Sequence, residues 1–198
     1  MTESRAICGV FLLLMTTGLA QNETESHEVD IIQFWNTSEL IWTTFTTSLE
    51  RKMCKADIKI DINEHNIAFC RAQIVHRGWR FREYNGTFRY FDQKSLYDSV
   101  RIQSKDRRNM EREILIYQSK NNSCAVFWIL SSKGYQLTPF YDLRIKDSYI
   151  EKEFPRKGEC WKQFEKLTGR RSIRQVHFKN CRVFSGVDTW ASRRRSEG

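Results

Sequence analysis

The chain has little of several features that mark familiar protein classes. Its 198 residues include two prolines and nine glycines, and they contain no internal repeat or low-complexity segment. These scarcities exclude a collagen-like or linker-rich chain and favour one compact domain. Beyond the N-terminal segment, no apolar run approaches the roughly 18 residues that a membrane-spanning helix needs.

The motifs of common catalytic and metal sites are also missing. GxSxG, HExxH, a Walker loop and the dinucleotide fingerprint do not occur, nor does any CxxC pair or close Cys/His cluster. Cys70 and His76 could suggest a thiol and base, but six strand residues separate them by roughly 20 Å. We therefore predict no enzymatic activity, no cofactor and no metal, with Cys70 as a buried apolar residue.

Residues 1–20 have the layout of a secretory signal peptide. Arg5 precedes an apolar core that ends in small residues at Ala20, and the alternative of a membrane anchor needs a longer core. The mature chain should begin at Gln21, be secreted and be soluble. Glycosylation sequons support this route, and they lie at Asn22, Asn36, Asn85 and Asn121.

The chain is moderately basic, with a formal net charge of +9. Acidic residues interleave with most of the basic segments, which favours a solvated surface over a nucleic-acid or heparin site. Cys8 leaves with the signal peptide, so five cysteines remain in an oxidising compartment. They should form two bridges and leave one odd thiol, and spacing alone leaves the pairing open.

Apolar residues alternate with polar ones along most of the chain, most clearly in "CKADIKIDIN", which predicts a half-buried strand. Asn85-Gly86 predicts a hairpin turn. The candidate strands, of which about eight should survive, are 40–47, 54–63, 67–76, 79–84, 87–91, 96–103, 113–118, 124–130 and 136–146.

A late helix is predicted within 155–169, because Trp161, Phe164 and Leu167 share one face and Gly169 can end it. Residues 27–35 could supply a short N-terminal helix. We therefore predict an all-β domain over 21–190, an eight-stranded antiparallel up-and-down barrel with the C-terminal helix packed outside. A β-sandwich is the alternative fold, and 191–198 form a basic tail.

The chain carries 26 aromatic residues, 6 Trp, 7 Tyr and 13 Phe, and many lie on the predicted strands. Most should be core, although several could line a cavity and present cation–π surface to a ligand. Composition alone assigns no single ring to either role.

The cysteine order, together with "FWNTSELIWTTFTT", "SCAVFWI" and "YDLRIKDSYIEKEFPRKGECWKQF", resembles the salivary lipocalins of ticks, the family named for its histamine-binding members. The resemblance runs from about Val29 to Cys181, although the general lipocalin G-x-W signature is missing. It implies a closed lipocalin-type barrel with bridges Cys54–Cys181 and Cys124–Cys160, which leaves Cys70 unpaired.

The bridge from Cys124 would pin the late helix over an apolar outer wall. Because strand residues alternate between faces, Ala125, Phe127 and Ile129 would then face the cavity. Members of the family sequester host inflammatory mediators such as histamine, serotonin or leukotrienes, so the resemblance implies a monomeric binding protein in saliva that suppresses host defence. The competing expectation is an immune modulator that binds a host protein, a complement component or a protease.

Amine-binding members carry an acid after the cysteine that matches Cys124 and a Glu-Leu-aromatic triplet on the next strand. This chain has Ala125 and Asp142-Leu143-Arg144 instead. If Asp142 points inward it could hold one ammonium group, with Trp42 and Phe45 as ring partners. Otherwise it is a rim residue or pairs with Arg144 or Lys146.

A lipid carboxylate is the alternative ligand group, because guanidinium groups bind carboxylates in a bidentate fork. The arginines that interleave with aromatic residues are Arg80, Arg82 and Arg89. We therefore predict a weakened amine site or a lipid site, with no nucleic acid and no membrane as partner.

Overall fold

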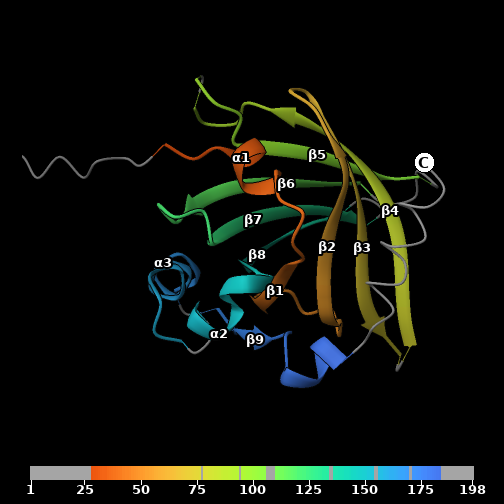
Figure 1. The fold of residues 1–198 in the computed structure, drawn as a ribbon, viewed down its shortest axis with the longest axis vertical. Helices are drawn as coiled ribbons and strands as arrows, with labels where there is room; N and C mark the ends of the chain where they lie inside the picture. The colour runs from red at the N-terminus through yellow and green to blue at the C-terminus, as the bar shows by residue number, and fades with distance from the viewer. Residues whose placement is uncertain are drawn as a thin grey trace, which may run out of the picture.

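The computed structural model describes residues 28–183, apart from 77, 94, 106–109, 134–135, 154–155 and 170. The predicted signal peptide, Asn22 and the basic tail lie outside the described residues. Within this part of the chain, a short helix, a run of strands and a late helix follow in the predicted order (Figure 1).

The strands pair with their chain neighbours through most of the sheet. Their bounds are β1 (Ile41–Thr46), β2 (Met53–Ile62), β3 (Asn66–Val75), β4 (Gly78–Arg89), β5 (Ser99–Ser104), β6 (Met110–Gln118), β7 (Cys124–Lys133), β8 (Gln136–Lys146) and β9 (Arg174–Gln175). The helices are α1 (Ile31–Trp35), α2 (Ile150–Glu153) and α3 (Glu159–Thr168), and the 3-10 turns are Asp147–Tyr149 and Lys179–Val183.

The sheet closes on itself through β1. This strand pairs antiparallel with β8 on one side and with β2 on the other, where Trp42 lies opposite Ala56. All the other neighbours from β2 to β8 are antiparallel, and β9 adds only two residues beside β1. The predicted eight-stranded up-and-down barrel is confirmed, and the sandwich alternative is wrong.

Helix α1 closes one end of the barrel. Its first residue, Ile31, donates its N–H to the carbonyl of Tyr97 in the β4–β5 connection. The helix then places Phe34 5.5 Å from Phe127 and Trp35 4.8 Å from Phe69, measured between ring centroids. These rings fill the closed half of the lumen, so any ligand space must lie toward the opposite end.

Helix α3 packs on the outer wall, beside β7 and β8 (Figure 1). It begins at Glu159, and Gly169 ends it by donating its N–H to the carbonyl of Glu165. The Cys124–Cys160 bridge ties this helix to β7, and Cys54–Cys181 ties the end of the described chain to β2. Both implied pairings are confirmed, and Cys70, which is buried, belongs to neither bridge.

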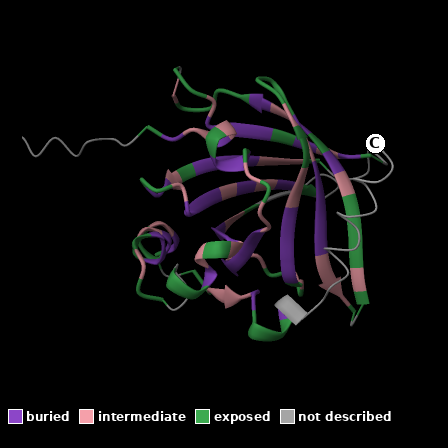
Figure 2. Ribbon diagram, in the orientation of Figure 1, coloured by how far each residue is buried: buried purple, intermediate pink, exposed green. Residues whose placement is uncertain are grey.

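The predicted hairpin at Asn85-Gly86 is wrong, because β4 runs without interruption through both residues. The structure needs the glycine for space rather than for a turn. A Cβ at Gly86 would lie 2.6 Å from Cγ2 of Val100 and 2.9 Å from Cγ2 of Ile67. Figure 2 shows the burial of β4 rising along the strand from its exposed first half.

We predict that Gly86→Ala lowers the free energy of unfolding by about 1–3 kcal/mol, because the added methyl group overpacks the lumen. Urea denaturation measures the change. Gly78→Ala is the matched control in the same strand, since its Cβ would meet nothing closer than 4.0 Å, and it should change stability by less than about 0.5 kcal/mol. Equal losses in both variants would contradict this explanation.

Candidate functional site

The polar side chains near the start of β2, Lys55 and Asp57, face the lumen, which the alternating sequence did not reveal. Residues 54–57 are buried on both faces of the strand. Cys54 and Ala56 join the outer cluster beneath α3, whereas Lys55 and Asp57 point into the barrel and pair with lumen residues. The strand is therefore buried on both faces at this end, and its inner face is charged.

A network of buried ion pairs crosses the lumen. Arg71 on β3 donates from Nε and Nη2 to the two carboxylate oxygens of Asp57, at 2.7 and 3.0 Å. Its Nη2 also donates to Glu113 at 2.8 Å, and Arg144 on β8 donates to the same carboxylate at 2.6 and 2.7 Å. Glu113 therefore lies between two guanidinium groups, and β3, β6 and β8 are linked across the barrel.

Lys55 and Asp142 form a second buried pair at the edge of this network. Nζ of Lys55 donates to Oδ2 of Asp142 at 2.7 Å, and Nη2 of Arg144 lies 3.7 Å from the same oxygen. The side chains of Lys55 and Asp142 are 10% and 1% exposed. Asp142 does point inward, and its close partner is a cation of the protein itself.

The fully buried charges of the lumen balance one another. Burial alone would raise the pKa of Asp142, but Lys55 and Arg144 outweigh this effect and hold the pKa below its usual value. The pKa of Glu113 is lowered for the same reason, by Arg144 and Arg71 against its burial. Both carboxyl groups are therefore ionised at neutral pH.

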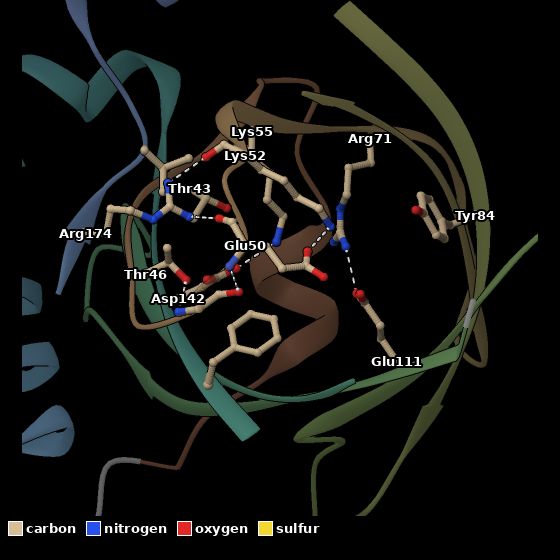
Figure 3. A pocket seen from close by; sticks show the side chains of 13 residues that line it. Thr43, Thr46, Glu50, Lys52, Lys55, Arg71, Tyr84, Glu111, Asp142 and Arg174 are labelled. Atoms are coloured by element: carbon tan, nitrogen blue, oxygen red, sulfur yellow. Dashed lines mark hydrogen bonds and ion pairs between the residues drawn. The ribbon is translucent and has the colours of Figure 1, made fainter. Parts of the chain in front are cut away.

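A small cavity lies at the end of the barrel where residues 47–52 connect β1 to β2, opposite the end that α1 closes. Its volume is about 30 Å³, enough for roughly two water molecules. We call it the mouth cavity (Figure 3). Four bases, three acids and six other residues line it: Lys52, Lys55, Arg71, Arg174, Glu50, Glu111, Asp142, Thr43, Thr46, Ser48, Tyr84, Phe140 and Val176.

The mouth cavity has unsatisfied donor atoms. Among the described residues, Oγ1 of Thr43 and Nε of Arg174 are buried without a hydrogen-bond partner. The other guanidinium nitrogens of Arg174 donate to the carbonyls of Glu50 and Lys52, which fastens the β1–β2 connection over the cavity.

The structure separates the residues predicted to bind a ligand. Ala125 and Phe127 are fully buried on the inner face of β7, opposite Arg144 and Asp142 on β8. Trp42 and Phe45 lie instead in the outer cluster, where the Phe45 ring is 4.8 Å from Trp161. A partnership of these two rings with an ammonium group at Asp142 is thus incorrect, because the strand alternation turns them outward.

The arginines suggested for a lipid carboxylate lie elsewhere. Arg80, Arg82 and Arg89 are exposed on β4, and none belongs to the described lining of the mouth cavity. The sequon residues Asn36, Asn85 and Asn121 are exposed. Each can carry a glycan, although Asn85 lies within β4 and not in a turn.

Reasoning from the sequence did not identify most of the residues that form the site. The alternation in "CKADIKIDIN" put Lys55 and Asp57 on the polar side of a half-buried strand, and Arg71, Glu111 and Glu113 were not singled out. A signal did exist, since "KAD", "ERE" and "DLR" each place two charged residues on the same face of a strand. Only the barrel geometry shows that these pairs meet.

The described part of the chain contains no group of three His, Cys, Asp or Glu side chains that could hold a metal ion. It also contains no helix long and apolar enough to cross a membrane.

Comparison with known proteins identifies the fold. No protein family model matches the chain, and no curated protein matches its sequence. The crystal structure of AM182 in complex with serotonin is similar, with a TM-score of 0.59 and 15% identity over 77% of this chain and 92% of that one. The siderocalin Ex-FABP, which functions through dual ligand specificities, has a TM-score of 0.53 and 11% identity over 72% and 94%. These likenesses show that the barrel has the lipocalin fold.

We predict that acid destabilises the protein through the buried carboxylates. The pKa values of Glu113 and Asp142 are lower in the folded chain, so their stabilising contribution is complete above the ordinary values of 4.5 and 3.8. It is lost as the pH falls below them. Urea unfolding at pH 7 and pH 3 should show this loss in the wild type.

Glu113→Gln tests the same network. It should cost about 3–5 kcal/mol at pH 7, because it leaves two buried guanidinium groups without a shared counter-charge, and it should lose less on acidification than the wild type. Glu64→Gln, at an exposed position, is the control. A Glu113 variant as stable as that control at pH 7 would show that the network contributes nothing.

Proposed function

We propose that this protein is a secreted lipocalin, of the tick salivary type that its sequence resembles, and that it sequesters a small host inflammatory mediator to suppress host defence. The ligand classes are biogenic amines such as histamine or serotonin and lipids such as leukotrienes. The observation that carries the proposal is the mouth cavity, a buried polar recess at the unplugged end of a lipocalin barrel.

Two further observations support a binding role. Two residues that line the cavity, Thr43 and Arg174, each carry a buried polar atom without a hydrogen-bond partner among the described residues, and such an atom is rare unless a ligand or water completes it. AM182, which shares the fold, was crystallised with serotonin. The two disulfides fit the oxidising environment of a secreted protein, and the exposed sequon residues Asn36, Asn85 and Asn121 fit glycosylation on that route.

A mediator must enlarge the cavity in order to enter, because two water molecules nearly fill it. The segment that covers it is the β1–β2 connection, which Arg174 holds through two backbone carbonyls. Ser48 lines the cavity from this connection, whereas the neighbouring Leu49 is 90% exposed. Binding should therefore displace residues 47–52 and leave the rest of the barrel in place.

Calorimetric titration of the deglycosylated, oxidised protein with histamine, serotonin and leukotriene C4 tests the proposal. We expect at least one of them to bind at one molecule per chain. Ser48→Trp should weaken that binding at least tenfold, because the indole fills the cavity entrance. Leu49→Trp places the same ring on the same connection but outside the cavity lining, and it should leave affinity unchanged.

Two results would count against the proposal. The first is the absence of binding by all three mediators to the wild type. The second is a mediator that binds equally well to the wild type and to Ser48→Trp, which would place its site away from the mouth cavity.

The small volume of the mouth cavity favours a second candidate function, a lipocalin-fold immune modulator that binds a host protein, either a complement component or a protease. Such a protein needs no open lumen, because it uses its outer surface. Capture from host plasma on immobilised protein distinguishes the two. A stoichiometric complement component or protease, recovered equally with wild type and Ser48→Trp, would support this second function.

A further inference from the structure

The carboxylates of the mouth cavity are already engaged by cations of the chain. Asp142 is paired with Lys55 at 2.7 Å, and Glu111 accepts from Arg71 at 3.0 Å. Glu50 lies 2.5 Å from Nζ of Lys52. A cationic ligand would have to compete with these groups for the carboxylate oxygens.

The polar atoms of the cavity lining that lack a partner can donate hydrogen bonds, in contrast to the carboxylates. Nε of Arg174 is a donor, and the hydroxyl of Thr43 can also donate. The lining carries four bases and three acids, and one of the bases, Arg71, also pairs with Asp57 and Glu113 beside the cavity. An anionic group that reached the spare donors would gain hydrogen bonds without breaking an existing ion pair.

We infer that the mouth cavity accepts the anionic head group of its ligand, and that Lys55 sets this preference by neutralising Asp142 from within the barrel. The inference rests on the proposed function, because it names the ligand class of the same site. A carboxylate fits both the spare donors and the small size of the recess, with the tail of the ligand directed out past the β1–β2 connection.

Lys55 excludes amines by occupying the position that their ammonium group needs. Its Nζ contacts Asp142 as a ligand cation would, and it reaches that place from β2 without any loss of translational freedom. A free amine would have to expel this tethered ammonium into a buried environment. Exchange of one cation for another gains no interaction, so the amine is disfavoured.

The test uses two probes of equal length and opposite charge, octanoate and octylamine, titrated by calorimetry at pH 7. Wild type should bind octanoate at least tenfold more tightly than octylamine. Lys55→Met, which keeps an unbranched side chain but removes the ammonium, should reverse this preference. Asp142→Asn, which frees Lys55 from its partner, should strengthen octanoate binding at least threefold.

Lys59→Met is the matched control, because Lys59 lies on the same strand and its Nζ bonds Asn36 at the surface. It should leave the octanoate preference of the wild type unchanged. Near-ultraviolet circular dichroism confirms that each variant is folded. If Lys55→Met does not fold, the gain expected for Asp142→Asn still decides the question.

The inference is overturned if wild type prefers octylamine, if the preference survives in Lys55→Met, if Asp142→Asn weakens octanoate binding, or if neither probe binds any variant. These outcomes are distinct from failure of the proposed function, which concerns the natural mediators. A barrel that ignores histamine, serotonin and leukotriene C4 but reverses its preference between the two probes would keep the role of Lys55 and lose the proposed mediator.

Discussion

The structure depends on one constraint, that charges buried inside the barrel must compensate one another. Six charged residues form the ion-pair network of the lumen and are at most 8% exposed, and these are Asp57, Glu113, Asp142, Lys55, Arg71 and Arg144. Removing such groups from water costs several kcal/mol each unless close partners replace the solvent. The three acids and three bases meet this demand because strands far apart in the sequence bring them together.

The same network divides the interior into two functional halves. Toward α1, the rings of Trp35, Phe69 and Phe127 fill the lumen, and Arg71 and Arg144 lie over these rings. Toward the β1–β2 connection, the charged groups leave a recess with spare donors. The recess is polar because it lies where the ion-pair network ends. The same side chains therefore determine both the stability of the barrel and the ligand that the recess selects.

The sequence predicted the framework of the fold well. Alternation marked the strands, the face shared by Trp161 and Phe164 marked α3, and the resemblance implied both disulfides. These features depend on local periodicity and on cysteine order, which a single sequence displays. The hairpin at Asn85-Gly86 failed because the steric need for glycine arises from Val100 and Ile67, neighbours that only the sheet register supplies.

The site was predicted less well, for a physical reason. Alternation shows that two faces differ, but it does not show which face is inside when both are buried. Lys55 and Asp57 were therefore interpreted as solvent-facing, and Trp42 and Phe45 as lumenal. The register of β1 and β2 instead places Lys55 and Asp57 in the lumen. It places Trp42 and Phe45 in the outer cluster. Ala125 and Phe127 were placed correctly inside, since the Cys124 bridge identified the outer face of β7, whereas Asp142 was left open between an inward position and the rim.

The most direct test of this account is a double-mutant cycle on the Lys55–Asp142 pair, which combines Lys55→Met, Asp142→Asn and the double variant in urea denaturation at pH 7. If Lys55 is the internal counter-ion of Asp142, the double variant should be more stable than the sum of the single losses predicts, with a coupling above about 1 kcal/mol. Losses that simply add would contradict the claim that this lysine neutralises the carboxylate within the barrel.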